Sequence, residues 1–417
     1  MLLGSVLTVA AATLSILGLW HWGTRGEGLP LAFSGDAYYV WLTAQSLAFD
    51  LDLDLTNQYA RYGDPWGLGS TPAADGWRFP PREIGPALLM VPGLWLGGFL
   101  GTSSPMSVVW ACAPTACALV ALGWICWSIS RRAAAWCPGC EDWEVLISAA
   151  ATLGFIVPFY SVGPAGYAHA PDAVATAFLV LLLLERRPGW QCGLAFAVCM
   201  LFRLQNALWL VWPVMVAWRA DRADRGVVLR WGTTILGLGG LGVLPQVVLA
   251  LRHPGSSAGS IRWTRDFFDL DHLGGDVMVV LVGEHGLLRF TPLVAVALGG
   301  AVLGLVAMMR HRLVSPLRLA GGASLLWLGL QVLLVAMVRD PDGGWAYGAR
   351  RFAGVSGLLP IWMFLGVAAF RRRWPRETET GRLMDRCFRV LVVVAIIANL
   401  LTTWLALRGD LSLMPAS

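Results

Sequence analysis

Apolar runs long enough to cross a lipid bilayer recur along the whole chain, and charged residues separate them. Runs of about 18 to 22 apolar residues have the length that a membrane-spanning helix needs. Apolar residues fill 57% of the 417 positions and charged residues only 14%, which is far from the composition of soluble proteins. The sequence therefore predicts an all-α protein that crosses the membrane many times.

Arginine indicates the side of the membrane on which each loop lies. The chain has 31 basic residues, and all of them are arginine. Cytoplasmic loops of membrane proteins carry an excess of basic residues. We therefore predict that five clusters are cytoplasmic: 131–132, 186–187, 219–230, 310–318 and 371–389. The polar segments 21–105, 161–170, 252–290 and 339–352 are then external. The net charge of +5 is spread over these clusters, so it indicates topology rather than nucleic-acid binding.

Between these loops we predict about eleven crossings, which form one integral membrane domain over residues 1–417. The spans are 1–20, 106–130, 145–160, 171–184, 190–202, 206–218, 231–251, 291–309, 319–338, 353–370 and 390–407. The first lacks the features of a removable signal peptide, so we expect it to be retained. The apolar stretch 84–100 cannot cross without placing every later arginine cluster outside. We predict that it is re-entrant or juxtamembrane, and broken at Pro92 and Gly93.

The longest polar stretch, residues 33–83, follows the first span. If residues 37–49 are helical, one narrow stripe is polar and apolar side chains cover the rest. This stripe consists of Asp36, Thr43, Ser46 and Asp50. Such a helix lies along the membrane surface, with its polar side facing a cavity. Asp36 is then a helix N-cap, a general base or a metal ligand, and the residues alone leave these alternatives open.

The rest of the first external loop offers carboxylates and arginines. The acidic run 50–54 (DLDLD) could bind a divalent cation, although we favour a solvated loop edge. Arg78 and Arg82 flank a corner at Pro80-Pro81. Arg82 and Glu83 are interpreted as a surface ion pair of small energetic weight.

For four further residues, a structural role competes with a functional one. His169 and His285 stand at external mouths of predicted spans, where a hydrogen-bonded structural histidine is more common than a catalyst. Cys137 and Cys140 have the spacing of a redox or metal site. No second such pair and no nearby histidine accompanies them in the sequence, so we interpret them as a tight turn.

The strongest second site is the run 343–352 (GGWAYGARRF). Its glycines allow close backbone approach, Trp345 and Tyr347 offer surfaces for sugar stacking, and Arg350 and Arg351 offer forks for a phosphate. Paired arginines in an external loop oppose the usual basic bias of cytoplasmic loops. We therefore favour a functional role over an interfacial anchor.

These features together resemble a known superfamily. An acidic residue soon after the first span, a long external loop with juxtamembrane helices and many short spans are similar to the GT-C glycosyltransferases. The run 35–59 (GDAYYVWLTAQSLAFDLDLDLTNQY) resembles the opening of a bacterial branch related to the protein O-mannosyltransferases and the lipid A aminoarabinose transferase. FRLQNALWLVWP, HGLLRFTP and GGWAYGARRF extend the resemblance to Phe352. Ala37 departs from it, because the family often has a second acidic residue there, and Thr291 replaces a serine.

The resemblance implies an inverting hexosyl- or pentosyltransferase on the external face of the bacterial cytoplasmic membrane. The donor would be a polyprenyl-phosphate sugar, and the acceptor a lipid, glycan or protein. Asp36 would be the general base, and Arg350, with Arg351 or Arg203 in reserve, would neutralise the leaving phosphate. The other expected substrate-binding residues are Tyr38, Tyr39, Arg78, Arg82, His169, Gln205, His285, Trp345 and Tyr347. Some relatives hold Mg²⁺ or Mn²⁺ beside the first-loop carboxylate and others do not, so a cation at Asp36 stays open.

Two other functions fit the same composition. A transporter or flippase of lipid-linked sugars typically has helices broken at mid-membrane and repeat symmetry, and the sequence shows neither. A non-catalytic membrane scaffold would use the external loops to bind a partner. Substitution of Asp36 separates these functions, because only the enzyme should fold normally and lose turnover.

Overall fold

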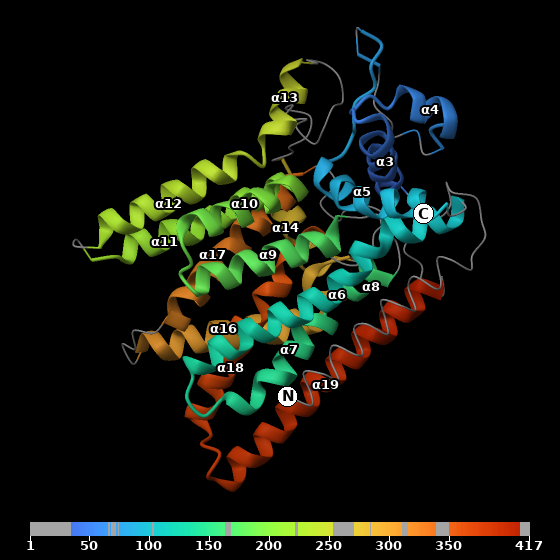
Figure 1. Cartoon of the computed structure of the whole chain (residues 1–417). Coiled ribbons are helices and arrows are strands. Elements are labelled where there is room, and N and C mark those ends of the chain that lie inside the picture. The colour runs from blue at the N-terminus through green and yellow to red at the C-terminus, as the bar shows by residue number, and fades with distance from the viewer. Residues whose placement is uncertain are drawn as a thin grey trace.

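The structure is a layered bundle of helices with the short helices of the first loop gathered at one end (Figure 1). This computed structural model describes residues 35–65, 67, 72–73, 75–101, 104–162, 168–221, 224–252, 271–283, 285–310, 316–338 and 350–408. The predicted first span, 1–20, lies outside the described residues.

The helices account for nearly all of the predicted apolar runs in the described part. The first are α3 (Asp36–Gln45), the π-helix η1 (Ser46–Asp50), α4 (Thr56–Tyr62), α5 (Ile84–Phe99), α6 (Ser104–Ala135), η2 (Glu141–Trp143), α7 (Glu144–Leu153) and α8 (Val157–Val162). Next come α9 (His169–Leu184), α10 (Gly189–Phe202), η3 (Leu204–Leu210), α11 (Val211–Arg219), α12 (Arg225–Gly240) and α13 (Leu244–Arg252). The last are α14 (Leu273–Val282), α15 (Leu287–Phe290), α16 (Pro292–Arg310), α17 (Pro316–Ala336), η4 (Arg350–Gly357), α18 (Leu359–Arg373) and α19 (Glu379–Arg408).

The chain is a multi-pass membrane protein. Among the described residues, 4 helices are long and apolar enough to cross a bilayer, namely α6, α16, α17 and α19. Two bent pairs, α12 with α13 and η4 with α18, raise this number to 6 if each pair is one span. Helices α5, α9 and α10 are apolar but shorter, with 16, 16 and 14 residues. At 1.5 Å per residue they cover about 21–24 Å of a hydrocarbon core about 30 Å thick. The total of eleven crossings stays a prediction.

Several predicted spans are interrupted, which the sequence analysis did not anticipate. The span at 145–160 is two helices, α7 and α8, with a break between Leu153 and Val157. The carbonyl groups of Leu153 and Phe155 at this break each accept a 2.7 Å hydrogen bond from the buried side chain of Asn399 in α19. The pairs α12/α13 and η4/α18 are bent by 47° and 56°. Broken helices are tolerated within a membrane where neighbouring side chains satisfy the freed backbone groups.

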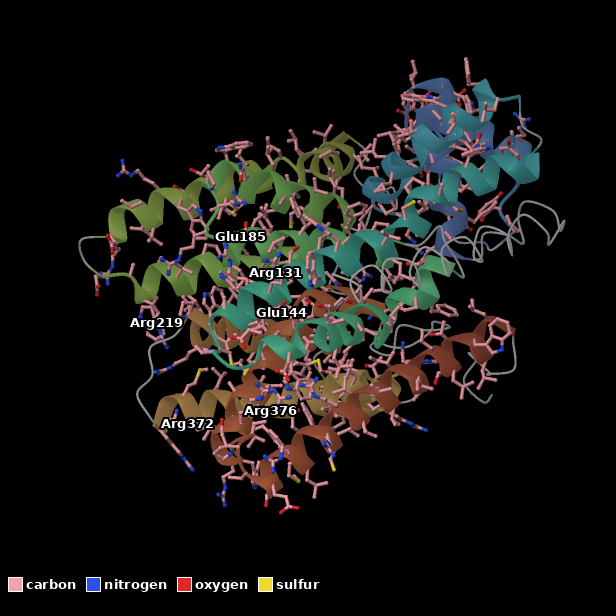
Figure 2. All side chains as sticks on the ribbon, turned by 60° about the horizontal axis from the view of Figure 1, so that its bottom comes forward. Arg131, Glu144, Glu185, Arg219, Arg372 and Arg376 are labelled. Carbon is pink, nitrogen blue, oxygen red and sulfur yellow. The ribbon has the colours of Figure 1, made fainter. Side chains whose placement is uncertain are left out.

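The turns that carry arginine lie together at one end of the bundle, named here the arginine-rich end (Figure 2). It comprises Arg131, Arg132, Arg187, Arg219, Arg371, Arg372, Arg376 and Arg389. Arg132 pairs with Glu185 at 3.5 Å, which joins the ends of α6 and α9. Arg371 pairs with Asp142 at 2.7 Å, which joins α18 to the segment between α6 and α7. Helices α3 to α5 lie at the opposite end in both views.

Helix α5 anchors the first loop to the bundle. It is one continuous helix with Pro92 inside it, so the predicted break at Pro92 and Gly93 is wrong. A side chain at Gly93 would overlap the carbonyl group of Trp110 in α6. A Cβ atom at Gly85 would lie 2.5 Å from the carbonyl oxygen of Leu201 in α10. Close packing on two neighbours holds the helix together despite the proline, because the bundle confines it on both sides.

Helix α3 and η1 form where the surface helix was predicted, but the polar stripe does not face a cavity. Thr43 and Ser46 are 1% and 0% exposed. Thr43 donates to a carbonyl group of its own helix at 2.8 Å, and Ser46 donates to Asp52 at 2.7 Å. Asp50 accepts a 2.9 Å hydrogen bond from Asn57. Ser46 and Asp50 thus hold the turn after α3, and Asp36 and Asp50 are the members of the stripe that remain accessible.

Helix η4 lies against α9 and thereby fixes the position of its first residue, Arg350. A Cβ atom at Gly357 would lie 2.7 Å from the Cα atom of Ala177, and one at Gly354 would lie 3.3 Å from Oγ1 of Thr176. Small residues let helix backbones approach closely within membrane proteins. The glycines of η4 thus set the distance between Arg350 and the mouth of α9.

Candidate active site

Asp36 begins α3, but its carboxylate does not cap the helix. Gly35 occupies the N-cap position, and no side chain caps the first turn. The Asp36 carboxylate turns instead to Arg82. Its Oδ1 atom lies 2.6 Å from Nη2 of Arg82 and accepts a 2.8 Å hydrogen bond from Nε. The N-cap interpretation is therefore wrong, and the carboxylate is held by a guanidinium fork.

Arg82 reaches Asp36 from the end of the first loop. It follows the Pro80-Pro81 corner and also donates to the carbonyl oxygen of Pro81 at 3.2 Å. The predicted surface pair of Arg82 with Glu83 is thus superseded, because the Arg82 fork is directed at Asp36. The two side chains are 34% and 33% exposed. An ion pair this accessible contributes about 0–1 kcal/mol to stability, so its main effect is to orient the carboxylate.

Arg350 brings a second guanidinium to the same carboxylate. Its Nη1 atom lies 4.0 Å from Oδ2 of Asp36, and its side chain is 17% exposed. Its carbonyl oxygen accepts a 3.3 Å hydrogen bond from Nη1 of Arg203. The predicted first-loop site and the predicted site at 343–352 therefore meet at Asp36.

The backbone next to Arg350 is held by two glutamines. The carbonyl oxygen of Arg351 accepts hydrogen bonds from Nε2 of Gln205 at 2.7 Å and from Nε2 of Gln331 at 3.1 Å. Gln331 lies in α17 and is fully buried. The sequence analysis missed it, although a lone glutamine inside an apolar run was a usable signal. Gln205, predicted to bind substrate, contacts the backbone of Arg351 instead.

Beneath these arginines lies a buried polar layer between α9 and the segment that follows α10. Nη1 of Arg203 lies 3.3 Å from Nδ1 of His169, whose ring centroid is 4.5 Å from that of Tyr160. Asp172 accepts a 2.7 Å hydrogen bond from Asn206. Buried polar groups that satisfy one another hold a unique arrangement, so this layer fixes Arg203 under Arg350.

The Asp36 cluster, defined as Asp36, Arg82, Arg203 and Arg350, carries a surplus of positive charge. Three guanidinium groups and one carboxylate leave two positive charges. One remains when the neighbouring groups Asp172, Glu83 and Arg351 are counted as ionised as well. Such a site favours a further anionic group, and planar guanidinium forks match the geometry of a phosphate.

The other predicted substrate-binding residues lie elsewhere. Tyr38 and Tyr39 are buried, and their hydroxyl groups donate to the end of α4 and to Asp64. Arg78 lies over the ring of Tyr59, 5.1 Å from its centroid. His285 is buried just before α15. Trp345 and Tyr347 fall outside the described residues.

A search for related sequences gives no matching family model and no matching curated protein. A solved structure does match: the archaeal oligosaccharyltransferase AglB from Archaeoglobus fulgidus, in complex with an inhibitory peptide and a dolichol-phosphate. The likeness covers 99% of this chain, with a TM-score of 0.53 and 13% sequence identity. AglB has the GT-C fold. This chain has the GT-C fold too.

The GT-C fold is thus shared with AglB, whereas the sequences have diverged almost completely. This chain spans 56% of the length of AglB. The resemblance in sequence motifs and the likeness in structure indicate the same fold.

The described part of this GT-C chain offers no built metal site. No group of three or more histidine, cysteine, aspartate or glutamate side chains gathers there. The described partners of Asp36 are the guanidinium groups of Arg82 and Arg350, which cannot act as ligands. The donor set around Asp36 in these residues does not fit a divalent cation, and no step below uses one.

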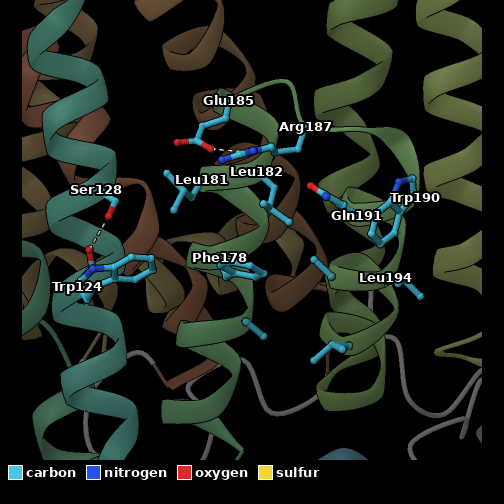
Figure 3. A pocket seen from close by; sticks show the side chains of 13 residues that line it. Trp124, Ser128, Phe178, Leu181, Leu182, Glu185, Arg187, Trp190, Gln191 and Leu194 are labelled. Carbon is cyan, nitrogen blue, oxygen red and sulfur yellow. Dashed lines mark hydrogen bonds and ion pairs between the residues drawn. The ribbon is translucent and has the colours of Figure 1, made fainter.

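A groove of ≈ 740 Å³ opens between α6, α9 and α10 in the half of the GT-C bundle near the arginine-rich end (Figure 3). Trp124, Phe178 and Trp190 line it, and the Glu185–Arg187 ion pair closes one end. None of the residues of the Asp36 cluster lines this groove. We assign it no part in the site.

Proposed function

We propose that this protein is a glycosyltransferase that moves a sugar from a polyprenyl-phosphate donor to an acceptor at the external membrane face. The observation that carries the proposal is the Asp36 cluster, in which one carboxylate lies between guanidinium groups. The GT-C fold supports it, and the neighbour AglB was solved with a dolichol-phosphate. A lipid tail would lie between the helices while its phosphate reaches the cluster.

In the proposed reaction Asp36 acts as general base. The acceptor hydroxyl or amide loses its proton to the carboxylate while its oxygen or nitrogen bonds to the anomeric carbon. The bond from that carbon to the phosphate oxygen breaks, and the lipid phosphate leaves with the electron pair. An acceptor that attacks from the side opposite the phosphate would invert the configuration. General-base assistance of this kind typically contributes about 10²–10⁴-fold in rate.

The arginines would act on the leaving group. Arg350 is held through its backbone and that of Arg351, so its guanidinium is fixed before the donor arrives. Charge develops on the departing phosphate, and fixed cations placed there lower the barrier. Arg82 would give up one of its two contacts with Asp36 and bind the phosphate instead. The carboxylate would then be released to accept the proton at the moment when the donor is bound.

The test uses the full chain in detergent or nanodiscs with a radiolabelled polyprenyl-phosphate sugar. Because the acceptor is unidentified, membranes of the parent cell supply it, and release of polyprenyl phosphate is measured. We expect turnover by the wild type, and loss of turnover in Asp36→Asn and Arg350→Ala. Asp224→Asn and Arg372→Ala are matched controls, because both residues are exposed and lie far from Asp36. Normal turnover in Asp36→Asn would refute the role of Asp36.

A transporter of lipid-linked sugars is the second candidate, because the structure contains the broken helices that the sequence did not show. The 56° bend between η4 and α18 lies at the end of the short helix that begins with Arg350 of the Asp36 cluster. Reconstituted liposomes separate the two functions. A transporter moves the intact lipid-linked sugar between leaflets without release of polyprenyl phosphate, whereas the enzyme releases it.

A further inference from the structure

Two cysteines form a close pair at the arginine-rich end. Cys137 and Cys140 lie in the turn between α6 and η2, where the N–H group of Cys140 donates to the carbonyl of Cys137 at 3.0 Å. Gly139 has a φ of +83°, which glycine adopts without strain. The predicted tight turn is confirmed. It also brings the two Sγ atoms to 2.6 Å from each other.

The pair lies beside a network of arginines and carboxylates. The guanidinium of Arg371 bonds to Asp142 at 2.7 Å and also contacts the sulfur of Cys140. Arg389 pairs with Asp385 at 2.9 Å and covers the ring of Trp143. Arg371 thus joins the sulfur pair to α18, and α19 contacts the neighbouring residues Asp142 and Trp143.

The two thiols are electrostatically different. The hydrogen bond between the two sulfurs, together with the guanidinium of Arg371, lowers the pKa of Cys140 despite its burial. The same bond, with burial, raises the pKa of Cys137. Asp142 opposes the effect on Cys140, and Glu141 adds to the effect on Cys137. The thiolate is the nucleophile in thiol–disulfide exchange. Because its pKa is lowered, Cys140 is the cysteine expected to attack a disulfide.

A structural metal does not account for the pair. Within the described residues, no third histidine, cysteine or carboxylate joins the two sulfurs to form a metal-binding group. Of the two carboxylates beside the pair, Asp142 is engaged by Arg371, Arg376 and Arg389, and Glu141 accepts a hydrogen bond from Gly139 N–H. Two thiols without further donors have the composition of a dithiol rather than of a zinc site.

We propose that Cys137 and Cys140 form a thiol–disulfide exchange site that reacts with small anionic disulfides. The Cys140 thiolate attacks one sulfur of the disulfide, forms a mixed disulfide and expels the first thiolate. Cys137 then loses its proton to water and attacks the Cys140 sulfur, which expels the second thiolate. The protein gains an internal disulfide, and the small disulfide is reduced to two thiols.

Size and charge determine the reactant. Cys137 and Cys140 are 6% and 1% exposed, and the residues between them, Pro138 and Gly139, are exposed. The turn must therefore open, and a small molecule enters more readily than a protein. Three arginines, Arg371, Arg376 and Arg389, face two aspartates, Asp142 and Asp385. Glu141 in the same turn adds a third carboxylate, so these charges balance. Arg371, the guanidinium beside Cys140, is therefore the cation that favours a carboxylate-bearing disulfide such as glutathione disulfide.

The experiment uses the full chain in nanodiscs with mixtures of glutathione and glutathione disulfide. After acid quenching and alkylation, mass spectrometry follows the peptide that contains both cysteines. We expect it to lose two hydrogen atoms as the proportion of disulfide rises, and to recover them with excess thiol. Cys387 is exposed near the start of α19 and serves as the internal reference for unassisted reaction. It should form a glutathione adduct only.

Variants test the direction of attack. Cys137→Ser should trap glutathione on Cys140, whereas Cys140→Ser should leave Cys137 unreacted over the same time. Arg371→Met should slow the trapping in the Cys137→Ser background. Arg376→Met, which also removes a bond to Asp142, should not. Thermal unfolding of each variant shows whether the fold is retained.

Three results would overturn the proposal. The first is a peptide that stays reduced under conditions in which Cys387 forms adducts. The second is trapping on Cys137 in place of Cys140. The third is purified protein that carries one equivalent of transition metal, released when these thiols are blocked. None of the three outcomes depends on glycosyl transfer, so this site and the Asp36 cluster can fail independently.

Discussion

The Oδ1 atom of Asp36 lies 2.6 Å from Nη2 of Arg82, a residue that is 46 positions further along the chain. This bond joins the first residue of α3 to the end of the first loop. It also gives Asp36 a fixed direction, with Arg350 4.0 Å from its other oxygen. The predictions that follow depend on this arrangement.

Asp36→Asn should abolish most turnover and change stability little. The substitution removes a proton acceptor, and general-base assistance is worth about 10²–10⁴-fold in rate. The lost ion pair is partly solvated, so we expect a decrease in unfolding free energy of about 1 kcal/mol or less. Turnover and thermal unfolding are measured on the same samples, and Asp36→Glu should retain partial turnover at best. A loss of turnover that follows a large loss of stability would show a structural role instead.

Arg350→Lys should reduce turnover although it keeps the charge, because lysine lacks the planar fork that matches a phosphate. Arg351→Ala is the matched comparison, because alanine retains the carbonyl oxygen that Gln205 and Gln331 hold. The measurement is initial rate at saturating donor. If Arg350→Lys is silent while Arg351→Ala is inactive, the assignment of the two arginines is reversed.

Gln331→Leu should lower kcat without unfolding the protein. Leucine fills the buried space in α17, but η4 loses one of the two bonds to the Arg351 carbonyl. Gln205→Leu removes the other bond. Because both act on one oxygen, the double variant should be non-additive in a mutant cycle. Strictly additive effects on kcat would mean that the glutamines act at different places.

Tyr38 should make the protein sensitive to strongly alkaline pH. Burial is the largest cause that raises the pKa of Tyr38 from 10.0 to about 12, and the negative charge of Asp64 is the second. A raised pKa means that the folded state holds the proton more firmly than the unfolded chain. Its contribution to stability is therefore complete below pH 10 and is lost as the pH rises through about 12. The unfolding midpoint is measured across this window. Tyr38→Phe should lack this part of the decline, and an unchanged profile would exclude it.

Cysteine labelling should place the two ends of the bundle on opposite sides of the membrane. Cys137 and Cys140 are predicted to stay unmodified from outside, but their burial alone would give that result. Cys387 at the start of α19 and a cysteine introduced as Arg61→Cys in α4 are better probes, because both positions are exposed. A membrane-impermeant maleimide on intact cells should label position 61 and spare Cys387. The reverse pattern would invert the predicted topology.

Helix type and order were predictable because apolar runs and arginine clusters report directly on the membrane environment. The turn at Cys137–Cys140 was predicted from the lack of a second such pair and of a nearby histidine. The break between α7 and α8 was not predicted, and it carries bonds from a distant residue, Asn399. The break within 231–251 was missed although Gly240, Gly242 and Pro245 were local signals for it. The hydrophobic pattern of the sequence predicts where a helix lies. It does not predict a bend such as that between α7 and α8, where contacts with another helix hold the chain.

The site was predictable in part. Asp36 and Arg350 were singled out from separate motifs, and the structure brings them within 4.0 Å. The partner of Asp36 was not predicted, because nothing local to Arg82 indicates a bond across the first loop. The polar stripe failed for a similar reason: Ser46 is used by Asp52 in the turn that follows.

The bonds from Asn399 to Leu153 and Phe155 have a consequence for biosynthesis. Residues 153–157 enter the membrane long before residue 399 leaves the ribosome. During that interval the broken segment has two carbonyl groups that wait for a donor not yet made. Until α19 is synthesised and inserted, the carbonyl groups of Leu153 and Phe155 lack the hydrogen bonds from Asn399. A premature stop before residue 399 should yield a chain that inserts every earlier helix and is nevertheless removed by membrane quality control.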